Sequence, residues 1–374
     1  METQSNVNKL AGYILKLGVL AAAVLFCWYF RSVLVYVILA FIVSLIGQPL
    51  MQLFRKIKIK GRGVPDWLLA VLSIAIIFAG LLLLVTQVFP VITMIIRDAS
   101  LFSDIHLPEG NFLDTANGWL VSVIPGLDSG TDAVGKVLDY LKGVTANISV
   151  TGIIGSVASV VVSLAIGLFS VAFISFFFVK DETLFIRMIA ALTPDRLEDS
   201  VKAAVGDIEH LLSRYFVGLI LEMLGVALLD FLGLWVIARI DLAYAAGIAF
   251  LAGILNIIPY VGPIIGEVLG VLLCVVLKYG AGVGLDVNIW VFAGIVLVIM
   301  LAVQLIDNFV YQPLIYSKSI QASPLEIFVV ILMASHIGGA IGMLAAIPAY
   351  TVVRVIAGRF LPENKVVKRL INHS

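Results

Sequence analysis

Residues 242–266 read LAYAAGIAFLAGILNIIPYVGPIIG and contain no charged side chain. A charge-free stretch of this length is typical of a segment within the bilayer, where every backbone amide needs a partner from the protein. Pro259, Gly262 and Pro263 exclude a plain helix through its second half, because proline removes an amide donor and clashes with the preceding turn. Broken backbone at membrane depth lines cavities in which transporters hold their cargo. The stretch therefore predicts a carrier.

The composition agrees with an integral membrane protein. Hydrophobic residues make up 61% and charged residues 13% of the 374, against roughly 25% charged residues in soluble proteins. The net charge is zero, so nucleic acid is not an expected partner. Cys27 and Cys274 both lie in apolar segments, and we expect no metal site and no cofactor. No catalytic or nucleotide-binding motif is present, so we expect neither an enzyme nor an ATP-driven pump.

Apolar runs of about 20 residues predict an all-α integral membrane protein. The predicted segments are residues 10–30, 33–54, 65–96, 151–179, 215–238, 242–277, 287–306 and 324–356. The chain would have eight spans if both broken regions cross the bilayer and six if both are re-entrant. We expect eight hydrophobic segments that include two broken or re-entrant helical hairpins.

The basic loops predict the orientation of the chain. The loop RKIKIKGR at residues 55–62 carries five bases and no acid, so it should face the cytoplasm. The amino terminus then lies inside, the acid-rich segment 97–142 outside, and segment 180–214 inside with an amphipathic helix. The tail is basic as well. Both termini are expected to be cytoplasmic.

These segments suggest six parts. They are an N-terminal hairpin scaffold (1–64), the third span and external loop (65–150), the fourth and fifth spans (151–240), the first broken hairpin (241–286), the last span with the second broken hairpin (287–359), and a basic tail (360–374).

The two broken regions resemble each other. Each holds an apolar helix, a break and a second apolar helix. The first is expected to turn from Asn256 through Pro259, Tyr260, Gly262 and Pro263; the second is expected to turn at His336, Gly338, Gly339 and Gly342. By the charge rule they enter from opposite sides, which predicts an inverted repeat with a binding site between the tips. The alternative is two kinks that only pack against neighbouring helices.

Polar side chains within the apolar segments are the candidate site. Gln304 shares a helix face with Asp307 and Asn308, and the three would offer a carboxylate and amides to one cavity. Alternatively, they join helices through hydrogen bonds. Asn256 either faces cargo or caps loose amides.

Buried acids are further candidates for the pathway. Glu222 and Asp230 lie eight residues apart near one face of the fifth span, and Glu267 follows the Gly262–Pro263 break by one turn. Glu222 and Asp230 are expected to face the protein interior, where each serves either transport or the packing of the bundle. Glu267 is expected to face the cavity at the break.

Three motifs resemble the autoinducer-2 exporter family over most of the chain. They are FFFVKD (176–181), NIIPYVGPIIG (256–266), and VQLIDN (303–308) followed by Gly338, Gly339, Gly342 and Pro348. The resemblance implies a multi-pass transporter of the bacterial inner membrane with an elevator-like fold, and homo-oligomers that include pentamers. The segment 313–324 and His336 depart from the family's pattern, which leaves the substrate undefined.

Three functions remain open from the sequence. The first is export of a small polar solute such as autoinducer-2, gradient-driven or facilitated. The second is sodium (or lithium)/proton antiport on buried carboxylates. The third is a membrane scaffold that transports nothing, in which case Asp307→Asn and Asn256→Ala would leave the phenotype intact.

Overall fold

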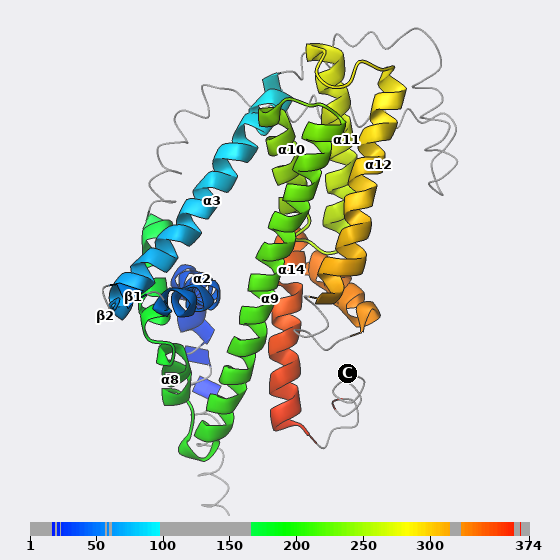
Figure 1. Cartoon of the computed structure of the whole chain (residues 1–374). Coiled ribbons are helices and arrows are strands. Elements are labelled where there is room, and N and C mark those ends of the chain that lie inside the picture. Colours follow the sequence, from blue (N-terminus) through cyan, green and yellow to red (C-terminus); the bar gives the residue numbers. More distant parts are fainter. Residues whose placement is uncertain are drawn as a thin grey trace, which may run out of the picture. The chain divides into compact units, whose positions relative to one another are not determined.

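The computed structural model of the chain describes residues 24–56, 58–59, 62–97, 166–314 and 323–362, with positions 17, 18, 21, 22 and 367 (Figure 1). Much of the predicted first span, the predicted external loop after residue 97, the first part of the fourth span and most of the basic tail lie outside the described residues.

The described chain is almost entirely helical, which confirms the predicted all-α class. One small exception lies in the basic loop, where β1 (Lys58–Ile59) pairs antiparallel with β2 (Arg62–Gly63). Within the described residues, six helices are long and apolar enough to cross a membrane, and two shorter apolar helices accompany them. The number of spans stays a prediction.

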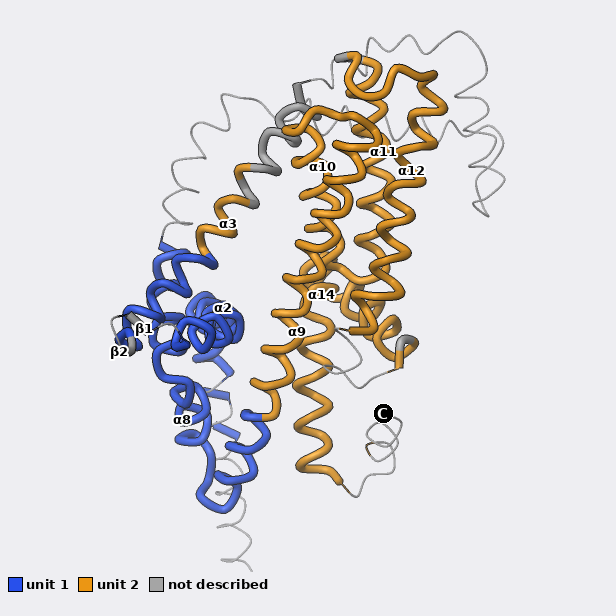
Figure 2. The backbone as a smooth tube through the Cα atoms, in the orientation of Figure 1, with its two compact units in different colours: residues 1–77, 162–206 blue, residues 78–161, 207–374 orange. Residues whose placement is uncertain are grey.

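Two compact units make up the chain (Figure 2). Unit 1 comprises residues 1–77 and 162–206, and unit 2 comprises residues 78–161 and 207–374. The boundaries fall within α3 (Asp66–Arg97) and α9 (Glu198–Leu232). The six predicted parts stay a prediction.

Unit 1 is built on α2 (Arg31–Arg55) and the helix Ile166–Lys180, followed by α8 (Leu184–Ala191) and the short 3-10 helix η1 (Asp195–Leu197). A Cβ atom at Gly47 would lie 2.8 Å from a methyl of Val179, so glycine allows close packing there. Ser175 donates its hydroxyl across the same contact to the carbonyl of Ala40 at 3.3 Å. α2 and the helix Ile166–Lys180 therefore pack directly against each other.

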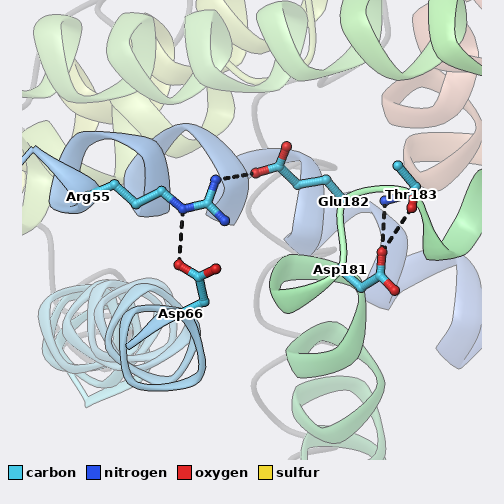
Figure 3. Close-up of polar contacts among 5 residues, drawn as sticks. All are labelled: Arg55, Asp66, Asp181, Glu182 and Thr183. Atoms are coloured by element: carbon cyan, nitrogen blue, oxygen red, sulfur yellow. Dashed lines mark hydrogen bonds and ion pairs between the residues drawn. The ribbon is translucent and has the colours of Figure 1, made fainter. Parts of the chain in front are cut away.

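Ion pairs join three segments at the end of α2 (Figure 3). The Arg55 guanidinium donates to Asp66 at 3.2 Å and to Glu182 at 2.9 Å. Nearby, Asp181 accepts from the amide and hydroxyl of Thr183 at 3.2 and 3.0 Å. Burial alone raises the pKa of Asp181, but the hydrogen bonds from Thr183 and the pairing with Arg187 outweigh it and hold this pKa below its ordinary value.

Replacing Arg55 by Met should have only a small effect. All three partners are substantially exposed, and exposed ion pairs contribute about 0–1 kcal/mol each. We expect a slightly lower midpoint of thermal unfolding for purified Arg55→Met. Lys56→Met is the control, since Lys56 forms no ion pair with any described residue. Equal midpoints for both variants would show that the Arg55 pairs contribute nothing.

Unit 2 includes the larger part of α9, followed by the π turn η2 (Gly233–Ile237), α10 (Leu242–Leu255), α11 (Val261–Ala281), α12 (Ile289–Ile306), the π turn η3 (Asp307–Tyr311) and α14 (Pro324–Phe360). An apolar core of side chains from η2, α10, α11 and α12 holds the upper helices of Figure 1 together, with Phe292 and Val296 fully buried. Gly253 brings α10 against α9, because a Cβ there would lie 2.7 Å from the Met223 carbonyl oxygen.

The first hairpin reverses between α10 and α11. Its turn comprises residues 256–260, and Tyr260 takes a left-handed backbone with φ of 66°. The predicted break at 259–263 is therefore placed slightly too late. Gly262 and Pro263 belong to the first turn of α11, where proline is tolerated because amides in the first turn have no partner within the helix.

The second hairpin is α14, which folds back on itself at Gly339. Gly339 has φ of 56° and ψ of −138° within an otherwise helical segment. Tyr350 donates its hydroxyl to Glu326 at 3.1 Å, although 24 residues separate them. A straight helix would hold these residues about 36 Å apart, so the two arms run antiparallel. The break lies inside the predicted turn, between His336 and Gly342.

Gly339→Ala should destabilise the second hairpin. The backbone at Gly339 lies in a region that is close to glycine-only, and such strain costs about 1–3 kcal/mol. Gly338→Ala is the matched control, since a Cβ there meets nothing within 4 Å. We expect a lower thermal midpoint for Gly339→Ala and a midpoint at or above that of the native protein for Gly338→Ala. The reverse order would contradict the assigned break.

The two hairpins contact each other in unit 2. The Tyr260 ring, in the turn of the first, packs edge-on against Phe328 of the second, with centroids 5.5 Å apart. Ile257 packs against the apolar cluster that Ile331 and Ile347 form on the arms of the second hairpin. The left-handed Tyr260 is therefore held in place by the neighbouring hairpin.

Candidate functional site

A network of four polar side chains lies where α12 passes into η3. The Gln304 amide donates to Asp307 Oδ2 at 3.3 Å and to Asn308 Oδ1 at 3.2 Å. The Gln312 amide donates to the same two oxygens at 2.8 and 3.1 Å. The predicted grouping of Gln304, Asp307 and Asn308 on one face is confirmed, and Gln312 completes it.

The π turn brings Gln312 to Asp307. In an α-helix, five residues turn the chain by about 500°, so a residue at i+5 faces away from residue i. In η3 the backbone N–H of Gln312 donates to the backbone carbonyl of Asp307, which is the i→i+5 pattern of a π-helix. The side chain of Gln312 then lies over that of Asp307. Single π turns within α-helices are frequent at functional sites.

Tyr311 packs the π turn against α9. A Cβ atom at Gly225 would lie 2.7 Å from the ring and hydroxyl of Tyr311, so only glycine leaves room for this side chain. The packing fixes η3 relative to α9.

Asp307 is fully buried, with 0% of its surface exposed. Its Oδ2 accepts from two glutamine amides, whereas its Oδ1 has no hydrogen-bond partner among the described residues. Burying a carboxylate oxygen without a hydrogen-bond partner costs free energy of folding. Binding of a ligand or a proton would reduce this cost, so Asp307 is a candidate for either.

An open cavity of about 520 Å³ lies between the first hairpin and α12. Its polar walls come from Glu267 on α11 and from Gln304, Asn308 and Gln312. Its apolar walls include Tyr260, Pro263, Ile264, Leu301 and Leu305. The tip of the hairpin and the amides of Gln304, Asn308 and Gln312 therefore face one space. Asp307 was expected to offer its carboxylate to the same cavity, but it is buried behind these amides and does not line the cavity.

A second, much smaller cavity lies deeper between α9, α10, α11 and α12. Asp230, Asn256, Glu267 and Gln304 contribute its polar walls. Asp230 and Asn256 are each 3% exposed. Pro263, Glu267 and Gln304 line both cavities, so the two are neighbours.

Most predicted pathway residues converge on these cavities. Asn256, Pro263, Gln304 and Glu267 line the smaller one, and Tyr260 and Asn308 line the larger one. Pro259 lies in the turn and Gly262 just after it. The predicted alternative for Asn256, capping of loose amides through its side chain, is wrong in this structure, because neither side-chain atom has a hydrogen-bond partner among the described residues.

Other predicted residues lie elsewhere in unit 2. Glu222 is buried in α9 but lines neither cavity. It lies close enough to Tyr215 for an electrostatic interaction. His336, Gly338, Gly339 and Gly342 line neither cavity and belong to the turn of the second hairpin.

Gln312 was not predicted as a site residue, although the sequence carries a usable signal. Gln304, Asn308 and Gln312 repeat at intervals of four, which places them along one helix face. The contact between Gln312 and Asp307 had no such signal, because it needs the π turn. Asp230 was expected to face the interior, and its burial confirms this.

Comparison with known proteins identifies the family. The sequence profile described as "AI-2E family transporter" matches residues 17–361. The chain belongs to the AI-2E family of transporters. It is 24% identical over 306 residues to the "Putative transport protein YrrI" of Bacillus subtilis (strain 168), covering 80% of each chain. It is 26% identical over 340 residues to the "Putative transport protein YueF" of the same organism, covering 87% of this chain and 85% of that protein.

AI-2E family membership and the apolar helices together describe a membrane transporter with several spans. Large apolar side chains are widely exposed on the described helices, for example Phe169, Val298 and Val353. Such exposure suits contact with lipid rather than water. Among the described residues, no group of three or more His, Cys, Asp and Glu side chains could hold a metal ion.

Proposed function

We propose that this AI-2E family transporter exports a small polar solute, of which autoinducer-2 is one example, through the cavity beneath the first hairpin. One observation carries the proposal. The tip of the hairpin faces the same cavity of about 520 Å³ as Gln304, Asn308 and Gln312, which hydrogen-bond to the buried Asp307 or to one another. That volume falls within the range of about 300–1,000 Å³ that is usual for small-molecule sites.

The lining argues for a neutral or cationic cargo. Glu267 is acidic, Gln304, Asn308 and Gln312 are amides, and the described lining includes no Lys, Arg or His. Anionic cargo would find no counter-charge, whereas amides donate to and accept from hydroxyl groups equally well. A neutral solute rich in hydroxyl groups fits best.

The lengths of the hairpin arms support a site at membrane depth. α10 has 14 residues and spans about 21 Å. This is shorter than the hydrocarbon core of about 30 Å. An arm that starts at one membrane surface therefore ends inside the bilayer. Residues 324–338, the first arm of α14, span about 22 Å and lead to the same conclusion.

The proposal includes an elevator-like mechanism, which the contact between the two hairpins supports. The two hairpins, in contact through Tyr260 and Phe328, would move with the cargo. We place the protein in the bacterial cytoplasmic membrane, with both termini in the cytoplasm, as a homo-oligomer and possible pentamer. Gradient-driven and facilitated export remain the two energetic options.

A flux assay tests the proposal. The purified protein is reconstituted in liposomes loaded with labelled autoinducer-2 or a neutral polyol, and efflux is followed with and without a proton gradient. We expect efflux of a hydroxyl-rich solute that falls sharply in Asn308→Ala and Gln312→Ala. No efflux of any such solute, from protein that is folded and correctly inserted, would contradict the proposal.

Carboxylates with unpaired oxygens favour a second candidate, sodium (or lithium)/proton antiport. Asp230, Glu267 and Asp307 each have a carboxylate oxygen without a hydrogen-bond partner among the described residues, and such oxygens suit a monovalent cation or a proton. The same liposomes report sodium and lithium exchange with a pH-sensitive dye. Cation exchange without solute efflux would replace the export proposal. Absence of both activities would favour the scaffold.

A further inference from the structure

The smaller cavity in unit 2 carries groups that the cargo cavity does not explain. Its accessible volume is about 10 Å³, which is close to the space that one buried water molecule needs. Four polar side chains line it: Asp230, Asn256, Glu267 and Gln304. A buried water makes about three hydrogen bonds to groups that otherwise lack partners.

The lining offers such groups. Asp230 Oδ1, both side-chain atoms of Asn256, and Glu267 Oε1 are buried and have no hydrogen-bond partner among the described residues. Asp230 and Asn256 are more than nine-tenths buried. Burying an amide and a carboxylate without partners costs about 1–3 kcal/mol or more for each group. A single water between them would satisfy several of these atoms at once.

The charged groups around the smaller cavity determine whether its two carboxyl groups can both ionise. Two carboxyl groups, Asp230 from α9 and Glu267 from α11, line it. Cys274 on α11 lies near Asp230 and carries no positive charge. Lys278, further along α11, donates instead to the carbonyl of Leu285. α10 contributes Asn256 and α12 contributes Gln304, neither of which titrates. No cation among the described lining residues compensates the pair.

Two neighbouring carboxylates without a counter-charge cannot both ionise cheaply in a buried site. We infer that this cavity binds one water molecule and one proton, shared between Asp230 and Glu267, with Asn256 holding the water. The pair then carries a net charge of −1. The proton moves from one carboxyl oxygen to the other through the water, and only O–H bonds form and break.

Glu267 connects the proposed proton site to the cargo cavity. It lines both the smaller cavity and the open cargo cavity, so a proton can reach Asp230 from the cargo side through Glu267. Deprotonation of the pair would place a second negative charge beside the cargo. The link to transport rests on the proposed function, whereas the existence of the proton site does not.

Infrared spectroscopy of the protein in lipid tests the site without a transport assay. A protonated carboxyl group gives a C=O stretching band that shifts in D₂O and disappears when the group ionises. We expect acid–base difference spectra of the native protein to contain one such band that is lost in both Asp230→Asn and Glu267→Gln. Asp207→Asn is the control, since Asp207 is exposed and paired with Arg359, and it should keep the band.

Asn256→Ala separates the water from the carboxyl groups. It keeps both acids but removes the proposed holder of the water, so the band should remain and change position. Spectra of Asp230→Asn that superimpose on those of the native protein would overturn the proton site. An unmoved band in Asn256→Ala would overturn the role of Asn256 and the water. If the native protein transports no solute but the predicted band losses are observed, the export proposal is contradicted and the proton site is supported.

Discussion

Replacing Gly262 by Ala should prevent the first hairpin from closing. A Cβ atom at this position would lie 1.7 Å from the carbonyl oxygen of Leu255 and 2.6 Å from its carbon. Both are backbone atoms at the end of α10, so no side-chain rotation can relieve the overlap. Overpacking costs about 1–3 kcal/mol and occasionally more, and we expect an effect at or above the upper end of that range.

The thermal midpoint of purified Gly262→Ala in detergent, at a fixed heating rate, measures this effect. Gly266→Ala is the matched control one turn later, since its Cβ would lie 3.4 Å from the nearest atom, in Ala252. We expect Gly266→Ala to unfold near the native midpoint. A Gly262→Ala protein as stable as Gly266→Ala would contradict the close approach of Gly262 to Leu255 across the turn at 256–260.

Replacing Asp307 by Asn should abolish most of the transport while the protein stays folded. Asparagine keeps the size of the side chain and can still accept from Gln304 and Gln312 with its oxygen at the position of Oδ2, but it removes the charge. Hydrogen bonds to charged groups contribute about 1.5–3 kcal/mol, against about 0.5–1.5 kcal/mol for neutral pairs. A loss of about 1–1.5 kcal/mol of stabilisation during transport corresponds to roughly a tenfold loss of rate. Flux in liposomes at equal protein content measures it.

Asp286→Asn is the control for Asp307→Asn. Asp286 is exposed in the loop between α11 and α12, so the same chemical change should leave the flux unaltered. If Asp307→Asn transports as well as Asp286→Asn, then the polar network only joins helices, which is the structural alternative that the sequence left open.

The ends of helices could be predicted from the sequence where a polar or charged residue lies at the end of an apolar run. The predicted spans 33–54, 65–96 and 287–306 correspond to Arg31–Arg55, Asp66–Arg97 and Ile289–Ile306. In each case a polar or charged residue terminates an apolar run, and lipid excludes such residues from the segment. The two hairpin turns were also placed within a few residues, because Pro, Gly and Asn interrupt otherwise continuous runs.

The details of the site depend on packing and could not be read from local sequence. The left-handed backbone of Tyr260 goes against its own preference and is held by contacts such as that with Phe328. Tyr311, in the π turn at 307–311, packs closely against Gly225, and these two residues are far apart in the sequence. The meeting of Asp230, Asn256 and Glu267 around one cavity joins three helices, which no spacing rule links.

Solvent access to the cavity tests the central claim, that water reaches the polar network beneath the first hairpin at membrane depth. Leu305 lines this cavity, whereas its neighbour Ile306 does not, although the two are 56% and 40% exposed. Each is replaced by Cys in protein that lacks Cys27 and Cys274, and the liposomes are treated with a hydrophilic maleimide. We predict rapid modification at 305 and little at 306. Equal, slow modification at both positions would contradict an aqueous cavity and, with it, the transport site.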